Sequence, residues 1–296
     1  MALGALALAA APVAAAHPDT APPRTPASGA ARQILPPGPW RPGSFRVAGA
    51  SPIQLATRSA NGSTAYVAWI DQTRTQLALY PGSQEPPAAS PRGPAEVPPG
   101  QRGRLLATFN GGFKAASNAG GFLVNGRVDL PLRTGLATLV EYRDGRVGIL
   151  DWGGRIPAHA LVLARQNLYP LVWAGRPARS AAASGLWGRT LGGGTAVWRS
   201  ALGITARGDL VYAAADGQTP ASLAALMVSV GAVRALELDI NPEWPSFIAY
   251  GAPGGRSPFK LVPNTQQTAG RYLRPDTRDF FAVYTRAGGG PYVPFR

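Results

Sequence analysis

Two carboxylates, Glu237 and Asp239, stand two residues apart in the apolar stretch Ala235-Leu236-Glu237-Leu238-Asp239-Ile240. This alternation predicts a β-strand, in which residues i and i+2 lie about 6.6 Å apart and point to the same face. Burying a carboxylate is unfavourable unless the group is paired or used. A pair of carboxyls on one face can supply an acid and a base for hydrolysis. The alternative is a solvated strand face, with Arg234 as a partner for the acids.

A glycine pair follows the predicted strand at 104–109, in the order Asn110-Gly111-Gly112-Phe113-Lys114. Gly111 and Gly112 permit positive φ and a close approach of the backbone to a ligand. Asn110 and Lys114, at the two ends of this loop, are candidate contacts to a sugar or a phosphate. The alternative for all four residues is an ordinary turn.

A single arginine, Arg199, lies in the predicted strand at 196–205. Because a guanidinium fork matches the oxygens of a phosphate, Arg199 is a candidate phosphate clamp. Its alternative role is a salt bridge within the sheet. Asn241, which follows the two carboxylates, is a further candidate substrate contact.

The elements that must position these residues are mostly strands joined by tight turns. The chain has 37 glycines and 30 prolines, and this composition favours turns over long helices. Hairpins are predicted at 120–130, around a type I′ turn at Asn125-Gly126, and at 137–152 and 196–216. The strand at 63–70 is expected to pair with 76–80, and 160–173 is either a strand pair or a helix. Further strands are expected at 247–250, 259–262 and 280–285. A short helix is expected between Thr219-Pro220 and Gly231. The predicted fold is α+β, with twisted mixed or antiparallel sheets and few helices in a single domain.

The first 45 residues differ in composition from the rest. Residues 1–16 are Ala-, Leu- and Val-rich, which is typical of a secretory signal segment. The alternative is an Ala-rich tail. Residues 17–45 are rich in Pro and Ala and predict an extended tether. Residues 46–296 then form the folded domain. No stretch reaches 18 continuous apolar residues, so we expect no transmembrane span. With the signal segment, we expect an exported, extracellular or envelope-associated protein.

The charge and the rare residue types limit the chemistry. The net charge is +14 and the chain has no cysteine. With His17 and His159 as the two histidines, a His-cluster or thiolate metal site is excluded. The basic excess favours an anionic partner. No basic run of five residues, recognition-helix pattern or zinc-finger spacing occurs, so we expect no nucleic-acid partner.

The order of the short motifs resembles the phosphodiester glycosidase family over about residues 63–285. The motifs are the glycine loop at 110–113, Gly-Phe-x-x-Asn-Gly at 121–126, Trp198-Arg199-Ser200-Ala201-Leu202-Gly203, the strand at 210–217 and the strand ending at Leu238-Asp239. Members of the family usually continue with glycines and then Ser-Ser. This chain continues with Ile240-Asn241-Pro242-Glu243-Trp244-Pro245-Ser246, so we expect a substrate pocket that differs from the family's.

The resemblance implies a hydrolase or transferase that cleaves the glycosidic bond of a sugar-1-phosphodiester in an envelope glycan. Such cleavage typically uses two carboxyls, here Glu237 and Asp239, with the phosphate bound by Arg199. No cofactor is implied. A divalent cation held by Asp239 and Asn110 is conceivable. The alternative function is a non-catalytic envelope protein that binds anionic polysaccharide.

Overall fold

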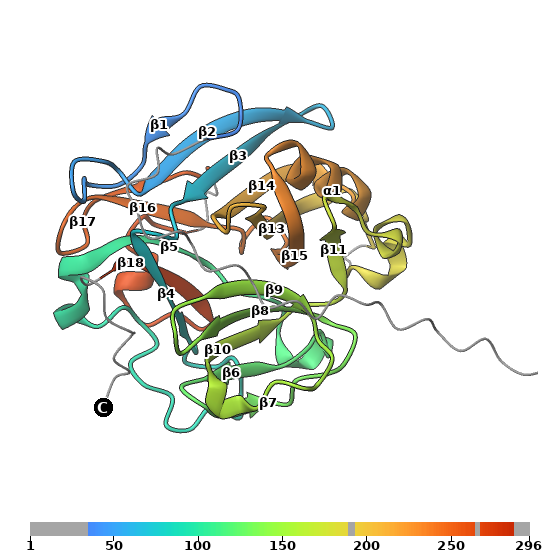
Figure 1. Ribbon diagram of the computed structural model, residues 1–296, viewed down its shortest axis with the longest axis horizontal. Coiled ribbons are helices and arrows are strands. Elements are labelled where there is room, and N and C mark those ends of the chain that lie inside the picture. Colours follow the sequence, from blue (N-terminus) through green and yellow to red (C-terminus); the bar gives the residue numbers. More distant parts are fainter. Residues whose placement is uncertain (1–34, 189–192, 264–266, 287–296) are drawn as a thin grey trace, which may run out of the picture.

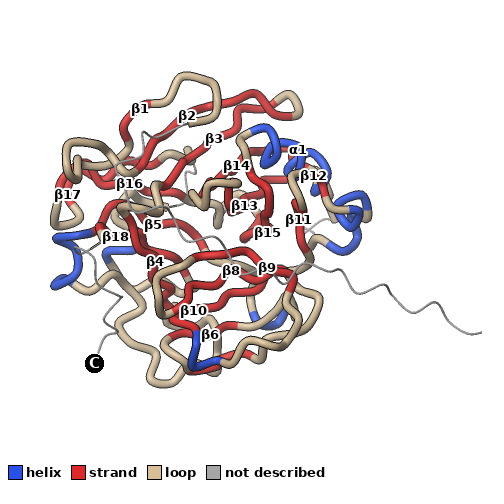
Figure 2. The backbone as a smooth tube through the Cα atoms, in the orientation of Figure 1, coloured by secondary structure: helices blue, strands red, loops and turns tan. Residues whose placement is uncertain are grey.

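The computed structural model describes residues 35–188, 193–263 and 267–286 (Figure 1). Strands account for 43% of the structure and helices for 13%. Figure 2 shows the same balance, with strands throughout and helices as short pieces at the periphery. The fold is therefore mainly β with little helix.

The largest sheet has eight strands. Its order is β1 (Arg41–Pro42), β2 (Ile53–Ala60), β3 (Ser63–Ile70), β14 (Leu210–Gln218), β13 (Val197–Thr205), β15 (Ala232–Ile240), β11 (Pro170–Trp173) and β12 (Arg176–Pro177). The strand with the two carboxylates, β15, lies between β13 and β11 in the interior of this sheet.

Two five-stranded sheets complete the β structure. One has the order β7 (Arg127–Leu130), β6 (Phe122–Val124), β10 (Leu161–Gln166), β8 (Ala137–Tyr142) and β9 (Val147–Asp151). The other has the order β17 (Arg256–Lys260), β16 (Phe247–Ala252), β5 (Leu105–Asn110), β18 (Phe280–Thr285) and β4 (Thr75–Tyr80).

Helix α1 (Pro220–Ser229) connects β14 to β15. The Thr219 side chain accepts from the Ser222 amide, and the Ser222 hydroxyl accepts from the Thr219 amide, so the helix begins with a capping box. Six 3₁₀ helices lie at Pro99–Arg104, Ala115–Ser117, Ala158–Ala160, Arg179–Ala182, Ser184–Leu186 and Arg271–Leu273.

The strand pairs decide between the two kinds of sheet that the sequence allowed, mixed and antiparallel. Every pair formed by the described strands is antiparallel. The chain leaves β14 through α1 and returns as β15, but β13 lies between these two strands and pairs with both. With one ten-residue α-helix among the described residues, the α+β class overstates the helical part.

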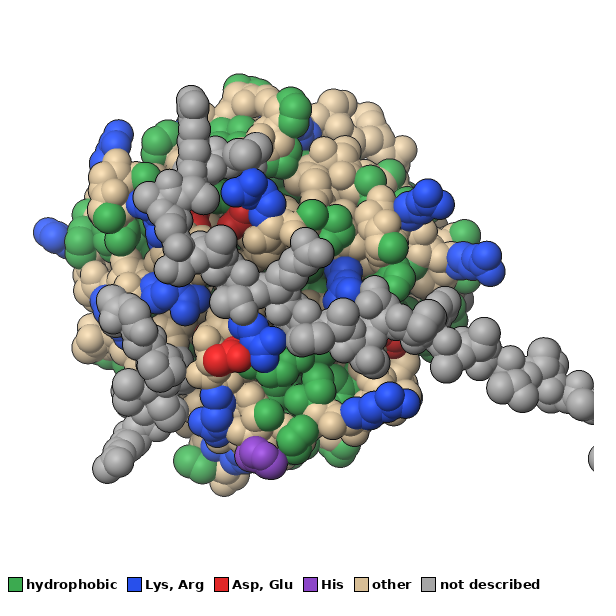
Figure 3. All heavy atoms as spheres, viewed as in Figure 1, with side chains coloured by type: hydrophobic (Ala, Val, Ile, Leu, Met, Phe, Trp, Pro, Cys, Tyr) green, Lys and Arg blue, Asp and Glu red, His purple; other side chains and the backbone are tan. Residues whose placement is uncertain are grey.

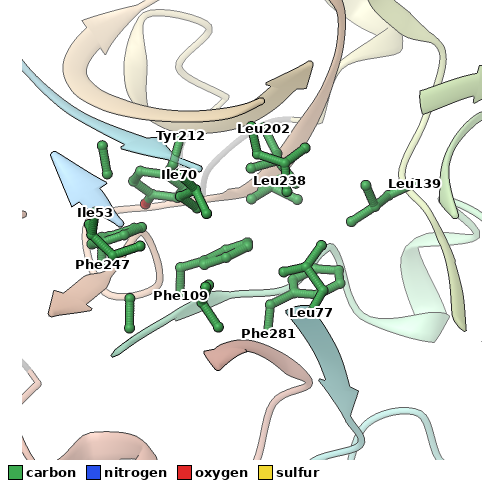
Figure 4. Close-up of a cluster of buried hydrophobic side chains, with 14 of the residues drawn as sticks. Ile53, Ile70, Leu77, Phe109, Leu139, Leu202, Tyr212, Leu238, Phe247 and Phe281 are labelled. Carbon is green, nitrogen blue, oxygen red and sulfur yellow. The ribbon is translucent and has the colours of Figure 1, made fainter. Parts of the chain in front are cut away.

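A hydrophobic core joins the three sheets. Phe109 of β5 stacks on Phe281 of β18, with ring centroids 5.1 Å apart, and on Phe247 of β16, at 5.9 Å. In Figure 4 these rings lie beside Leu238 of β15 and Leu139 of β8, which come from the other two sheets. This core fixes β5, β15 and β18 relative to one another.

The predicted hairpins at 120–130, 137–152 and 196–216 are confirmed as β6–β7, β8–β9 and β13–β14. Asn125 and Gly126 both have positive φ, 52° and 79°, as a type I′ turn requires. The expected pairing of 63–70 with 76–80 is wrong. β3 pairs with β2 and β14, whereas β4 pairs with β18 in another sheet. The alternation in the two segments predicts strands but does not identify their partners.

The expected signal segment and most of the tether, residues 1–34, lie outside the described residues. From residue 35 the chain contacts the fold. Trp40 and Leu35 pack against a buried cluster, Phe45 packs against the main core, and Arg41–Pro42 pairs with β2. The extended backbone that proline favours can form an edge strand, so this part of the tether belongs to the folded structure. Of the helices described, none has the length and apolar character needed to cross a membrane.

Candidate active site

The inner part of β15 is buried on both faces. Leu236 and Leu238 are fully buried in the main core. Glu237 and Asp239 point away from that core and are buried as well, at 0% and 7% exposure. Both carboxyls are therefore in a region where an ionised group needs a close partner.

A β-bulge separates the two carboxylates. Arg199 of β13 lies opposite Ile240, and Ala201 lies opposite Glu237, so three steps along β15 face two steps along β13. An extra residue in one strand twists that strand and redirects its side chains. Glu237 and Asp239 consequently have different environments, although simple alternation places them on one face.

Glu237 forms an enclosed ion pair with Arg199. Arg199 Nη1 donates to Glu237 Oε1 at 2.6 Å, and both side chains are fully buried. Burial raises the pKa of Glu237 to about 8, while the charge of Arg199 acts in the opposite direction. The other donors of Arg199 reach backbone carbonyls of Gln218, Trp187 and Thr195. Arg199 thus anchors the backbone at Trp187 and at Thr195, and neither residue of the pair lines the cleft described below.

Asp239 forms a second pair, with Arg278. Arg278 Nη2 donates to Asp239 Oδ2 at 2.6 Å, and the Ile240 amide donates to Oδ1 at 2.9 Å. Burial raises the pKa of Asp239 to about 7, against the lowering effect of Arg278 and of the Ile240 amide. A carboxyl with a pKa near neutrality can exchange a proton at physiological pH.

Asp239 and Arg278 line a cleft of about 380 Å³. Lys114 supplies a further charge at the cleft, and Phe113, Leu186 and Trp244 supply apolar walls. Arg278 lies 4.9 Å from the centre of the Trp244 ring, which is a cation–π distance. The cleft therefore combines one carboxyl, two cations and an aromatic surface, a combination that suits an anionic ligand with an apolar or sugar portion.

Asn110 lies beneath the cleft rather than in it. Its Oδ1 accepts from Tyr212 Oη and from the Ser246 amide, and its Nδ2 donates to Ser200 Oγ. Ser200 Oγ in turn donates to the backbone carbonyl of Asp239 at 2.7 Å. Asn110 is 3% exposed and its amide is fully used, so it positions the Asp239 backbone and does not take the expected role of a sugar contact.

The glycine pair is required by protein side chains. A Cβ on Gly111 would lie 2.0 Å from Asp279 Oδ2, and one on Gly112 would lie 2.9 Å from Arg165 Nη2. Asp279 and Arg165 form a buried ion pair with an Nε–Oδ2 distance of 2.9 Å. The close approach expected at these glycines thus serves an internal ion pair next to the cleft, and not a ligand.

Lys114 and Asn241 are the two predicted substrate contacts that line the cleft together with Asp239. Asn241 adopts a φ of +90°, a conformation that glycine tolerates far better than other residues. The loop after Asp239 therefore keeps a glycine-type backbone at this position without a glycine. Backbone strain of this kind is concentrated at functional sites.

Arg278 and Trp244 were missed by the sequence reasoning. Arg278 and Asp279 directly precede the apolar run of β18, and β18 pairs antiparallel with β5, which places Phe280 opposite Asn110. A charged pair at the start of a buried strand can indicate a functional site. Which site it belongs to becomes clear only once the neighbouring strand is known.

Side chains that could ligate a metal ion do not cluster within the described residues. No group of three or more His, Asp or Glu side chains is placed to hold a metal ion there. The amide of Asn110 and the carboxyl of Asp239 have separate protein partners. On the face shown in Figure 3, the Lys and Arg side chains lie in separate groups.

No protein-family model matches the sequence, and no curated protein matches it. Among solved structures, the fold is similar to the catalytic domain of zebrafish N-acetylglucosamine-1-phosphodiester alpha-N-acetylglucosaminidase, which is auto-inhibited by its pro-peptide. The TM-score is 0.50 at 15% identity, over 82% of this chain and 87% of that chain.

Two further structures are more distant. A hypothetical protein from Synechocystis has 14% identity and a TM-score of 0.45, over 84% of this chain and 64% of its own. A putative exported protein from Burkholderia pseudomallei has 15% identity and a TM-score of 0.37, over 75% and 74%. The likeness to the zebrafish domain shows a related fold.

Proposed function

We propose that the protein is a hydrolase that cleaves the glycosidic bond of a sugar-1-phosphodiester, and that Asp239 is its proton-transfer residue. The observation that carries this proposal is the Asp239 carboxyl, which lines the cleft with a pKa of about 7 and lies beside two cations. The likeness in fold to a phosphodiester glycosidase domain supports the substrate class, and so does the order of the sequence motifs.

One carboxyl in the cleft is sufficient for this reaction. The leaving group is a phosphomonoester dianion, whose conjugate acid has a pKa of about 6, so it is a weak enough base to leave the anomeric carbon without being protonated. In the proposed step the bond between the anomeric carbon and the phosphate oxygen breaks, and its electron pair stays on that oxygen. A water oxygen bonds to the anomeric carbon and its proton passes to the Asp239 carboxylate. The products are a free sugar and a phosphomonoester.

The remaining expected residues divide into two groups. Lys114 and Asn241 line the cleft and are proposed substrate contacts. Glu237 and Arg199 are proposed to support the cleft wall from below, because their ion pair anchors the backbone at Trp187. Since Glu237 does not reach the cleft, the proposal departs from the two-carboxylate scheme.

The test is a release assay with a panel of sugar-1-phosphodiesters, in which both the free sugar and the phosphomonoester are measured. Activity should rise as the pH increases through about 7, because a base must be ionised to accept a proton. Asp239→Asn should lower kcat at least 100-fold while the variant remains folded. Asp151→Asn, at an exposed position on β9, is the matched control and should retain full activity.

Two outcomes would count against the proposal. A folded Asp239→Asn protein with unchanged kcat would remove Asp239 from the chemistry. Binding of an anionic polysaccharide without release of sugar from any member of the panel would instead support the non-catalytic alternative.

A further inference from the structure

Arg278 has hydrogen-bonding capacity that the protein leaves unused. A guanidinium has five N–H donors. Nη2 donates to Asp239 Oδ2 at 2.6 Å and to the Gly112 carbonyl at 2.9 Å. Nε is buried and has no partner among the described residues, and none of these residues accepts from Nη1. A buried donor without a partner is unfavourable, so a ligand that offers acceptors gains from binding here.

The other buried arginines near the cleft are occupied. Arg199 donates from Nε, Nη1 and Nη2 to protein acceptors, and Arg165 does the same. Arg278 is also buried, at 5% exposure, but unlike Arg165 and Arg199 it forms part of the cleft wall. Arg278 therefore combines an unused donor with a position at the border of a space that a ligand can enter.

The guanidinium is held in a defined orientation. Trp244 lies 4.9 Å away on one side, and the Gly112 carbonyl fixes Nη2. The charged residues that line the cleft are Lys114, Arg278 and Asp239, so the cleft has a net single positive charge when Asp239 is ionised. A rigid fork with a net single positive charge suits an anion with two oxygens and one negative charge.

We infer that Arg278 binds the phosphate of a monoanionic phosphodiester, and that this phosphate competes with Asp239 for the same guanidinium. This inference rests on the proposed function for the identity of the natural ligand. It adds the residue that recognises the phosphate and a coupling between phosphate binding and the protonation of Asp239. When the phosphate shares the guanidinium, the charge of Arg278 stabilises the Asp239 carboxylate less, and the carboxylate becomes the stronger base that hydrolysis requires.

The coupling predicts that protons favour binding. A protonated Asp239 no longer holds Arg278 as an ion pair, so phosphate should bind more tightly below pH 7 than above it. Other charged groups surround Asp239 in addition to Arg278. They are Asp279 and Arg165, Glu237 with its partner Arg199, Arg271, and Lys114 in the cleft. Asp239 lines the cleft itself and pairs directly with Arg278, so the Asp239→Asn variant isolates its contribution.

The experiment is a calorimetric titration of the full chain with dimethyl phosphate between pH 5.5 and 8.5. This probe is a monoanionic phosphodiester without a glycosidic bond, so it cannot be consumed. The wild-type affinity should fall as the pH rises through about 7. Arg278→Gln should weaken binding at least tenfold, and Arg278→Lys should retain part of it. Arg256→Gln, an exposed arginine on β17, should leave the affinity unchanged.

Asp239→Asn separates ligand binding from a purely structural role. This variant should bind dimethyl phosphate at least as tightly as the wild type at pH 8 and should lose the pH dependence. Equal affinity in a folded Arg278→Gln protein would overturn the inference, as would an unchanged pH dependence in Asp239→Asn. If Arg278→Gln does not fold, the Asp239→Asn titration still decides.

Failure of this inference and failure of the proposed function give different results. Binding of dimethyl phosphate through Arg278 without cleavage of any sugar-1-phosphodiester would retain the phosphate site and reject the hydrolase. Cleavage that is insensitive to Arg278→Gln would retain the hydrolase and reject the phosphate site.

Discussion

Replacing Arg199 with alanine should destabilise the fold by several kcal/mol, because it leaves Glu237 buried without its cation. Both side chains of the pair are fully buried, and removing one partner of such a pair typically costs about 3–5 kcal/mol. The carbonyls of Gln218, Trp187 and Thr195 also lose their donor. At about 2–4 °C per kcal/mol for a domain of this size, Tm should fall by roughly 10 °C.

The size of this effect should depend on pH. Burial raises the pKa of Glu237 to about 8, and the loss of Arg199 raises this pKa further. Below pH 8 Glu237 can therefore take up a proton, which removes the uncompensated charge and reduces the loss of stability. The free energy of unfolding of Arg199→Ala should accordingly lie closer to the wild-type value at pH 6 than at pH 9.

The measurement is urea unfolding at pH 6 and pH 9, followed by tryptophan fluorescence. Arg146→Ala is the control. It breaks the exposed pair with Asp144 and should cost less than about 1 kcal/mol. Adding Glu237→Gln to Arg199→Ala should restore part of the lost stability, since it removes the unpaired charge. A loss below about 1 kcal/mol at pH 9, or no recovery in the double variant, would refute a structural role for the pair.

Two further predictions concern stability. Gly111→Ala should cost more than about 2 kcal/mol, because the new Cβ would lie 2.0 Å from Asp279 Oδ2, whereas Gly153→Ala meets no atom within 4 Å. Equal urea midpoints for these two variants would contradict the steric argument. Glu141 is fully buried with no partner for either oxygen among the described residues, and burial raises its pKa from 4.5 to about 8. The contribution of the Glu141 carboxyl to stability is present below pH 4.5 and is lost as the pH rises to about 8. The free energy of unfolding of Glu141→Gln should therefore gain on that of the wild type by up to about 1.4 kcal/mol per pH unit in that window. If the free energies of unfolding of Glu141→Gln and wild type differed by the same amount at pH 5 and pH 8, this role for Glu141 would be excluded.

Local structure was predictable where it depends on neighbouring residues. Asn125-Gly126 specifies a type I′ turn because both residues tolerate positive φ, and the turn brings β6 and β7 together. Thr219 followed by Pro220 marks the first turn of α1, since threonine caps free amides and proline has none to satisfy. The alternation in β15 likewise predicts its strand and its core-facing leucines.

The partners of these elements depend on the tertiary structure. Arg199 lies 38 residues before Glu237, and Arg278 lies 39 residues after Asp239. In a chain with 29 Lys and Arg, no local pattern indicates which cation meets which acid. The sequence also predicts β4 as a strand but does not identify its partner, which is β18 rather than β3.

Glu237 and Asp239 show most clearly which features follow from the local sequence and which depend on tertiary contacts. Their spacing in the sequence places both carboxyls on one face of a strand. The bulge between β13 and β15 arises from pairing with a distant strand, and it separates an enclosed structural pair from a carboxyl in the cleft. The presence of two acids in a largely apolar strand can be read directly from the sequence. Only the assembled sheets decided which of the two acids reaches the cleft, because burial and pairing there are set by residues far away in the chain.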